Sequence, residues 1–353
     1  MRRSITLALF FLSVFILPAF PALQGFITMQ DGYFFDASTG KPFVPHGIAY
    51  QTWNRPLGVW QTFDQIDYDL DEMVKMGANS IRVDFVWQHI EEQGDNVWSW
   101  TNYDYLLQAA DKRNLRVFAL VGYQWPPSWF PDSYYTMHPP GYDSEGIYHP
   151  TRWQSDIINY EHPQARAQYS NFLYTVCNRY KDNKAVAGWI VGNEYGYLGL
   201  WSLKYDGYDP NSEAAFRTWC TQKYGTIASL NTTWGSGYTN FNQIVLVDEY
   251  AWKGPKGAEW ADMTQWREDS IANFTAAGAR AARVGDTNHL LSYSTVGMQW
   301  GEEDWRYHAE DRGKIARACA SNNAALAFFS INNYPWALDG SETRNAQWGI
   351  SYT

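Results

Sequence analysis

The stretch AVAGWIVGNEYG, residues 185–196, decides the fold. Its apolar run stops at an amide, Asn193, and a carboxylate, Glu194, follows at once, before aromatic residues and glycines. A continuous apolar run of this length is typical of a strand buried on both faces of a parallel sheet. Polar residues at the carboxyl end of such a strand lie at the mouth of a barrel, where the functional groups of that fold gather.

Strand and helix patterns alternate along the rest of the chain. We predict a hairpin over residues 27–43 with its turn at 36–41, and strands over residues 44–50, 81–86, 115–121, 185–191, 290–296 and 326–332. Helical patterns cover residues 67–76, 103–113, 163–180, 211–224, 260–284, 310–320 and 343–352. This alternation predicts an α/β fold, a (β/α)8 TIM barrel with about six of its eight strands present and its C-terminal part missing. A doubly wound sheet is the alternative, but no GxGxxG motif supports it.

Length and charge limit the class of protein. The chain has 353 residues and a formal net charge of -10, which suits one large domain and argues against nucleic acid as a partner. Three cysteines, Cys177, Cys220 and Cys319, lie far apart without metal-site spacing. Either one pair forms a disulfide in an oxidising compartment or all three are buried thiols. The pattern of histidines predicts neither a metal nor a cofactor.

The N-terminus has the pattern of an export signal. Arg2 and Arg3 precede an apolar stretch over residues 5–16, and small residues follow at 18–22. We therefore predict a signal peptide over residues 1–22, a mature domain over residues 23–353, and a secreted or periplasmic protein. A retained anchor is the alternative, although the apolar stretch is short for a bilayer. After cleavage no membrane association is expected, and the oligomeric state stays open.

The chemistry of the strand end favours a sugar substrate. Aromatic residues make up 18% of the chain, with 19 Trp and 25 Tyr, and such side chains suit the apolar and hydroxylated faces of sugars, although they also suit a core. Glycoside cleavage needs a carboxylic acid that protonates the leaving oxygen and a second carboxylate. We predict that Glu194 is this general acid/base and that Asn193 binds a substrate hydroxyl. A carboxylate that only caps the next helix is the alternative.

Other residues are expected around this carboxyl group. Arg82 lies in the second strand, where a buried charge needs a carboxylate partner, unless the side chain points outward. Tyr334 follows the sixth strand and is expected to donate a hydrogen bond to the nucleophile, unless it packs in the core.

Three further aromatic residues and one histidine complete the predicted site. Prolines stiffen the segment around Trp125 and Trp129, one of which we expect to be a sugar platform. His46 and Trp87 lie near the ends of the first two strands and are expected at the same mouth. The sequence contains no GxSxG motif, so a serine hydrolase is not expected.

Several of these segments resemble the retaining glycoside hydrolases of clan A, and in particular family 42, the β-galactosidase type. The matching segments are residues 77–82 with Trp87 and Glu91, then 126–129, 188–196, 216–219, 223–226, 230–231 and 234–235. The resemblance covers roughly residues 44–336, and its early part is also similar to family 5. It implies that Glu194 is the acid/base, Asn193 a substrate ligand and Arg82 a support for the nucleophile.

The chain departs from that family in two respects. It lacks the family's zinc-binding cysteine cluster, and the family's nucleophile is a glutamate at the end of a seventh strand. Glu302, Glu303 and Glu342 follow the fifth and sixth strands, so we expect the nucleophile beyond Thr353. The functional hypothesis is a secreted retaining β-glycosidase that acts on oligo- or polysaccharides, most simply β-galactosides. The alternatives are an endo-acting β-mannanase or β-glucanase and a non-catalytic carbohydrate-binding barrel.

Overall fold

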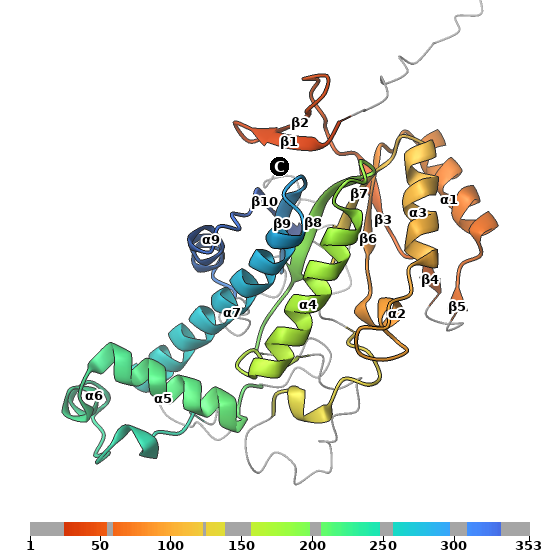
Figure 1. Ribbon diagram of the computed structural model, residues 1–353. Coiled ribbons are helices and arrows are strands. Elements are labelled where there is room, and N and C mark those ends of the chain that lie inside the picture. The colour runs from red at the N-terminus through yellow and green to blue at the C-terminus, as the bar shows by residue number, and fades with distance from the viewer. Residues whose placement is uncertain are drawn as a thin grey trace, which may run out of the picture.

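The computed structural model describes residues 25–54, 59–122, 125–137, 157–197, 206–247, 257–296 and 309–332. Its centre is a parallel sheet of six strands in the order β10-β9-β8-β7-β6-β3. Each of these strands therefore pairs with the sheet strand that precedes or follows it along the chain. The sheet curls into a half-barrel with helices on its outer side (Figure 1). The strands run β1 (Ile27–Gln30), β2 (Tyr33–Asp36), β3 (Gly47–Tyr50), β4 (Trp53–Asn54), β5 (Val59–Trp60), β6 (Ser80–Asp84), β7 (Arg116–Leu120), β8 (Val186–Asn193), β9 (Leu290–Val296) and β10 (Phe328–Asn332).

Helices alternate with these strands. Their bounds are α1 (Phe63–Lys75), α2 (Trp87–Ile90), α3 (Thr101–Lys112), α4 (Pro163–Tyr180), α5 (Pro210–Tyr224), α6 (Ile227–Trp234), α7 (Ala258–Gly285) and α9 (Arg312–Ser321), with short 3-10 turns η1 (Asp132–Tyr134) and η3 (Phe241–Gln243). The pair α5 and α6 extends away from the sheet beside the far end of α7 (Figure 1). The segment between the predicted helices 211–224 and 260–284 contains a further helix, α6, which Thr226 caps by accepting from the Ser229 amide.

The predicted hairpin exists, but its turn was placed wrongly. The Asp31-Gly32 pair makes the turn, with positive φ at both residues, as a tight two-residue hairpin requires. The segment predicted as the turn, residues 36–41, is a second reversal that Asp36 organises by accepting from the amides of Ser38 and Thr39. Aspartate favours turns because its carboxylate accepts hydrogen bonds from nearby backbone amides, so Asp36 predicts a reversal of the chain but not that it is the hairpin turn.

This hairpin lies across the amino-terminal edge of the sheet (Figure 1). Phe34 from β2 contacts Phe118 of β7 in a tilted arrangement at a ring-centroid distance of 6.2 Å and Phe328 of β10 edge-on at 5.2 Å. Ile27 and Phe43 belong to the same apolar cluster. The hairpin therefore closes one end of the half-barrel with apolar side chains and leaves the carboxyl ends of the strands for polar groups.

Strand β8 lies in the interior of the sheet, between β7 and β9. Every residue from Val186 to Gly192 is buried, and Asn193 is half-buried, as the apolar run predicts. Between its contacts with β9, the strand advances three residues, Ile190 to Asn193, while β9 advances two, Ser292 to Ser294. This extra residue is a β-bulge, a feature that re-aims the side chains that follow it. The bulge sets the direction of Asn193 at the carboxyl end.

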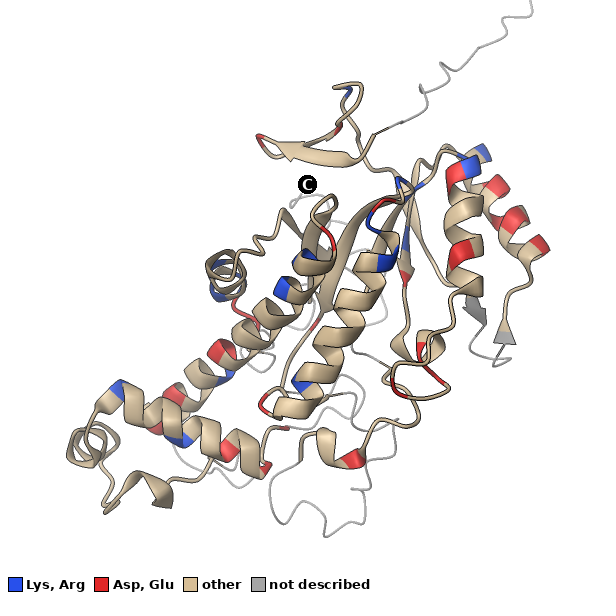
Figure 2. Cartoon of the chain, viewed as in Figure 1, with Lys and Arg blue, Asp and Glu red and all other residues tan. Residues whose placement is uncertain are grey.

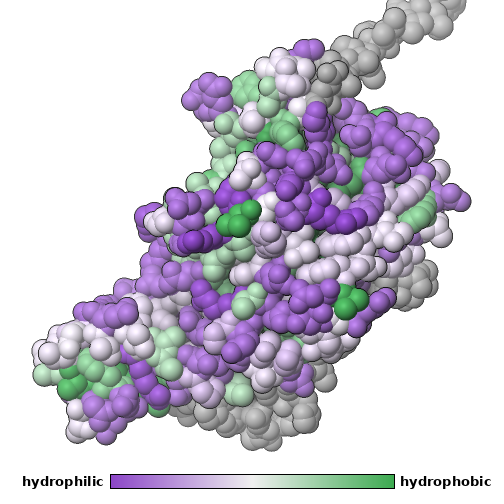
Figure 3. Space-filling model, viewed as in Figure 1, coloured by the Kyte–Doolittle hydropathy of each residue, from purple (hydrophilic) through white to green (hydrophobic). Residues whose placement is uncertain are grey.

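Charged and apolar residues are distributed as expected for helices that cover a sheet. Acidic residues gather along α1, whereas the strands and much of α4 carry few charges (Figure 2). The helix-covered face is mostly hydrophilic, with scattered apolar side chains (Figure 3). Cys177, Cys220 and Cys319 are all buried free thiols, so the second of the two alternatives for the cysteines is the one observed.

Helices α4 and α7 pack so closely that one glycine is required between them. A Cβ on Gly285 would lie 2.6 Å from the Tyr174 carbonyl oxygen and 3.1 Å from the Asn178 amide nitrogen, both backbone atoms of α4. Because backbone cannot move aside as a side-chain tip does, this contact fixes how closely α7 approaches α4.

Gly285→Ala should therefore lower the free energy of unfolding by about 1–3 kcal/mol, the usual cost of overpacking. Thermal or denaturant unfolding measures the change. Gly237→Ala is the matched control, because no heavy atom lies within 4 Å of the position its Cβ would take. Equal stability of the two variants would contradict the packing argument.

Candidate active site

The carboxyl ends of four strands bring polar side chains together. Arg82 comes from β6, Asn193 and Glu194 from the end of β8, Ser294 from β9, and Asn332 from the last position of β10. Parallel strands place their carboxyl ends on one edge, so residues more than a hundred positions apart meet there. The group lies at the end of the half-barrel opposite the β1–β2 hairpin.

The backbone of Glu194 is unusual. Its φ is 50°, in the left-handed region that non-glycine residues rarely adopt. Its amide donates to the Ser294 carbonyl oxygen at 2.9 Å, so the turn is tied to β9. Such backbone strain costs on the order of 1–3 kcal/mol and is found mainly at functional sites. Here it turns the Glu194 side chain toward the other polar residues of the edge.

Among the residues that the structure describes, Asn332 is a close hydrogen-bond donor to the carboxyl group of Glu194. Asn332 Nδ2 donates to Oε1 at 2.6 Å. Burial raises the pKa of Glu194 above its ordinary value, while the hydrogen bond from Asn332 and the charge of Arg82 act in the opposite direction. The net direction is upward, so the protonated form persists to higher pH than for an exposed glutamate. A half-buried carboxylic acid of this kind is suited to donate a proton.

Asn193 is held from both sides. Its Oδ1 accepts from Arg82 Nη2 at 3.2 Å and from Asn332 Nδ2 at 2.8 Å. Because both donors bind the oxygen, the orientation of the amide is fixed, with its nitrogen on the other side. Arg82 also forms an ion pair with Asp84, at 3.5 Å between Nη1 and Oδ1. The guanidinium of Arg82 therefore lies on the inner side of the sheet, between Asp84 and Asn193.

Asn332 is the functional residue that sequence reasoning missed. Its Nδ2 contacts both Asn193 and Glu194, and its Oδ1 accepts from Ser294 Oγ at 2.8 Å. The prediction had selected Tyr334 from the same segment. The available signal was the position of Asn332 at the end of the sixth strand, because strand-end amides of a barrel share one edge.

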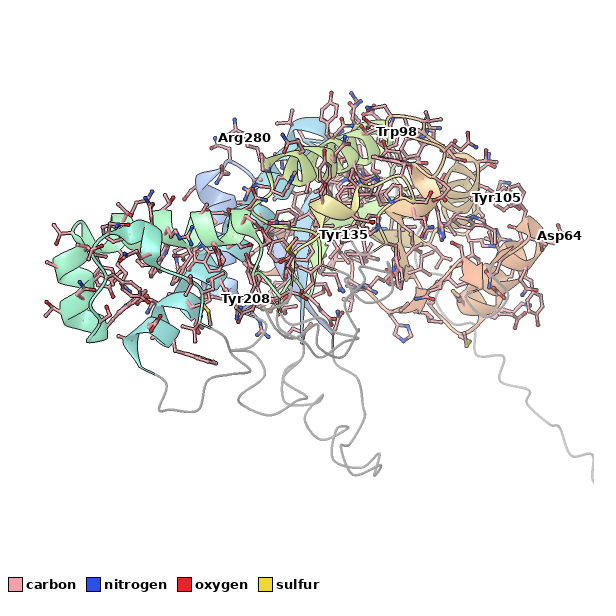
Figure 4. All side chains as sticks on the ribbon, turned by 90° about the horizontal axis from the view of Figure 1, so that it is seen from below. Asp64, Trp98, Tyr105, Tyr135, Tyr208 and Arg280 are labelled. Atoms are coloured by element: carbon pink, nitrogen blue, oxygen red, sulfur yellow. The ribbon has the colours of Figure 1, made fainter. Side chains whose placement is uncertain are left out.

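Loops after β7 and β8 are joined on the same side of the sheet. Tyr208 donates its amide to the Met137 carbonyl oxygen at 3.0 Å, and Thr136 Oγ1 donates to Asp209 Oδ2 at 3.1 Å. Tyr135 and Tyr208, labelled in Figure 4, are both buried. These contacts anchor the bases of the two loops, and Asp209 in turn caps α5 through the amides of Asn211 and Ser212.

Trp125 and Trp129, one of which is predicted to be a sugar platform, lie beside α2. Trp129 donates its indole N–H to the Glu91 carbonyl oxygen at 2.6 Å, and the Trp125 carbonyl oxygen accepts from the Gln88 amide at 2.9 Å. Both tryptophans are half-buried, and Trp125 has a φ of 83°. The loop after β7 is thus fixed to α2, as its prolines predict. Contact of either ring with sugar stays a prediction.

Two predicted site residues lie elsewhere. Trp87 is fully buried, its ring stacks on Phe172 at 5.1 Å, and its indole donates to Glu91 Oε2 at 2.6 Å, so it is a core residue. His46 precedes β3, which begins at Gly47, and its amide binds Asn79. It therefore lies at the amino-terminal edge, away from Glu194. The prediction for His46 was wrong because this residue lies at the amino-terminal end of its strand, whereas the site lies at the carboxyl ends.

Some predictions fall outside the residues that the structure describes. These are Tyr334, the glutamates at 302, 303 and 342, the helix over residues 343–352 and the signal peptide over residues 1–22. Among the described residues, no group of three or more His, Cys, Asp and Glu side chains is arranged to hold a metal ion. No helix in the same part of the chain has both the length and the apolar character needed to cross a bilayer.

A half-barrel with a half-buried carboxyl group, an oriented amide and an arginine at its carboxyl edge is the arrangement expected of a TIM-barrel glycoside hydrolase. The sequence model of glycoside hydrolase family 42, described as beta-galactosidase, matches residues 58–309. The chain belongs to this family. Beta-galactosidase BgaA of Thermus sp is 26% identical over 259 residues, which cover 71% of this chain and 38% of that protein.

Solved structures agree on the fold. Beta-galactosidase from the psychrophilic Marinomonas ef1 superposes with a TM-score of 0.66 at 20% identity, over 83% of this chain and 41% of that one. The catalytic domain of beta-amylase from Paenibacillus polymyxa gives 0.64 at 16% identity, over 81% and 76%. The predicted TIM-barrel class is confirmed. The chain spans less than half the length of the beta-galactosidases it matches.

Asn332→Ala should raise the pKa of Glu194 further. The Asn332 amide stabilises the ionised carboxyl through its 2.6 Å hydrogen bond, so its loss favours the protonated form. Titration of isotope-labelled glutamate by NMR, with Glu194→Gln to assign the signal, measures the shift. Asn322→Ala is the control, because the Asn322 amide binds the Ala318 carbonyl oxygen on α9 and should leave the titration unchanged. A lower pKa in Asn332→Ala would contradict the assignment.

Proposed function

We propose that the protein is a retaining β-glycosidase that acts on β-galactosides, with Glu194 as its general acid/base. The observation that carries the proposal is the Glu194 carboxyl group itself. It is half-buried at the carboxyl end of the fourth barrel strand, with a raised pKa and a hydrogen bond from the Asn332 amide, in a chain that belongs to family 42. The family's description as beta-galactosidase supports the choice of sugar.

Glu194 serves two steps in this proposal. In the first it donates its proton to the glycosidic oxygen as the sugar is transferred to a carboxylate nucleophile, and in the second it accepts a proton from the attacking water. Burial favours the protonated form needed first, while Asn332 and Arg82 stabilise the ionised form needed second. The opposing influences keep both forms accessible.

Asn193 and Arg82 have supporting roles. Asn193 is oriented through its oxygen by Arg82 and Asn332, which directs its amide nitrogen for a substrate hydroxyl. The positive charge of Arg82 lies at this edge of the sheet and would favour the ionised form of a carboxylate nucleophile placed beside it. The nucleophile is proposed to come from a seventh strand, as the family resemblance implies.

Glu194→Gln in the complete protein should lower kcat for an aryl β-galactoside by about 10²–10⁴-fold, the usual contribution of a positioned acid/base. Glu259→Gln is the matched control, because burial also raises the pKa of Glu259, which lies on α7 near its start. Unchanged turnover in Glu194→Gln would contradict the assignment of Glu194 as the general acid/base. Polysaccharide substrates assayed in parallel separate a β-galactosidase from an endo-acting β-mannanase or β-glucanase, and sugar binding without turnover by the wild type would indicate a binding barrel.

We also propose export from the cytoplasm through a cleaved signal peptide. The supporting pattern is two arginines, an apolar stretch and small residues within residues 1–22. The mature protein should begin at Leu23 after cleavage at Ala22, or at Phe20 after cleavage at Ala19, and N-terminal sequencing of protein from the medium or periplasm measures this directly. Replacement of Leu9 and Phe10 by aspartate should keep the protein in the cytoplasm. An intact N-terminus on exported protein would contradict cleavage.

A further inference from the structure

A buried carboxylate lies behind the proposed acid/base and takes no part in the chemistry described above. Glu310, two positions before α9, is 8% exposed. Its Oε1 accepts from the Tyr293 hydroxyl and its Oε2 from Thr295 Oγ1 at 2.8 Å. Both hydroxyls come from β9, the strand that also binds the Glu194 amide. Glu310 therefore contacts the support of the site without facing its mouth.

Tyr293 connects this carboxylate to the turn at Glu194. The Tyr195 amide donates to the Tyr293 hydroxyl oxygen at 2.8 Å. The pKa of Tyr293 is raised well above its usual value, mainly by burial and further by the charge of Glu310, so its hydroxyl keeps its proton. Because that proton is donated to Glu310, the oxygen presents its lone pair to the Tyr195 amide. The direction of both hydrogen bonds is thus fixed.

The turn needs this support because it is strained. Glu194 has a φ of 50°, and such a conformation persists only where the surroundings hold it. Three consecutive amides are held: Glu194 by the Ser294 carbonyl oxygen, Tyr195 by Tyr293, and Gly196 by the Tyr160 hydroxyl at 3.2 Å. Among these acceptors, the Tyr293 hydroxyl is oriented by a carboxylate, Glu310, and the Tyr160 hydroxyl donates to the Gly196 carbonyl oxygen.

The ring and the hydroxyl of Tyr293 act separately. A Cβ on Gly192 would lie 2.8 Å from Tyr195 Cζ and 2.8 Å from Tyr293 Cε2, so the tyrosine rings already close over the bulge of β8. A change from tyrosine to phenylalanine keeps this packing and removes only the hydrogen bonds. The hydrogen-bond contribution is therefore open to a direct test.

We propose that Glu310 and Tyr293 are positioning residues for the acid/base: Glu310 orients the Tyr293 hydroxyl, which holds the Tyr195 amide and so fixes the direction of the Glu194 carboxyl group. This inference rests on the proposed role of Glu194. Neither residue touches the substrate. Loss of the hydroxyl lets the strained turn relax and moves the acid away from the glycosidic oxygen, which reduces proton donation without removing the acid.

Misplacement of an acid has a kinetic signature. A leaving group with a high pKa needs the proton in the transition state, whereas a dinitrophenolate leaves well without it. Tyr293→Phe should therefore lower kcat/KM about tenfold or more for a methyl or phenyl β-galactoside, and about twofold or less for the dinitrophenyl β-galactoside. A merely structural loss of folded enzyme lowers both values by the same factor.

The experiment measures this leaving-group ratio in the complete protein for Tyr293→Phe, Glu310→Ala and Glu310→Gln. Glu310→Gln keeps an oxygen that accepts from the Tyr293 hydroxyl and should lose less than Glu310→Ala. Tyr180→Phe is the matched control, because Tyr180 is also buried and donates to a carboxylate, Asp104, at 2.8 Å, but lies at the end of α4. Its ratio should equal that of the wild type.

The results decide between two failures. If Glu194→Gln shows the expected loss of turnover while Tyr293→Phe and both Glu310 variants keep the wild-type ratio, the positioning role is overturned and the proposed function stands. If Glu194→Gln is fully active, the proposed function itself is wrong. Should Tyr293→Phe not fold, the Glu310 pair decides alone: a selective loss with the poor leaving group supports the proposal, and an unchanged ratio overturns it.

Discussion

The left-handed turn at Glu194 is the constraint on which the site depends. A buried strand that ends in a regular conformation would carry its last side chains alternately inward and outward. Here the bulge of β8 and the positive φ of Glu194 break that alternation, so Asn193 and Glu194, although adjacent, both hydrogen bond to Asn332. The strain is modest beside the stability of a domain, and the amide contacts to β9 offset it.

Opposing influences act on the pKa of Glu194, and which of them is larger decides whether the carboxyl group holds its proton. Burial is the larger one and raises the pKa of Glu194, and the Asn332 hydrogen bond and the Arg82 charge only reduce that rise. Arg82 is itself shared with Asp84, at 3.5 Å, which weakens its effect on Glu194. A guanidinium in direct contact with Glu194 would favour ionisation and remove the proton that the first step needs. The present distances keep Arg82 on Asn193 instead.

The sequence predicts the sheet well and the partners of the acid less well. Residues 185–191 and 163–180 predict β8 and α4 because a continuous apolar run and a proline at the helix start are local signals. Asn332 lies 138 residues from Glu194, and its contact depends on the curl of the sheet across β9, which no local pattern contains. Trp87 and His46 were placed wrongly because a sequence pattern does not define exactly where a strand begins and ends. It therefore does not define which side chains point toward the site.

The abundance of tyrosine has a physical explanation different from the one that composition suggests. A tyrosine-rich chain predicts sugar contacts, yet Tyr160, Tyr169, Tyr195 and Tyr293 are all fully buried around the Glu194 turn. An irregular strand end leaves amides and carbonyls without ladder partners, and buried backbone groups must be hydrogen bonded. Tyrosine fills the core with its ring and delivers a hydroxyl about 6 Å from its own backbone. The Tyr169 hydroxyl, for example, contacts the carbonyl oxygens of Val121 and Val191, at the ends of two neighbouring strands. The same aromatic residues that build the core thus stabilise the one stretch of backbone that departs from regular structure, and that stretch carries the acid.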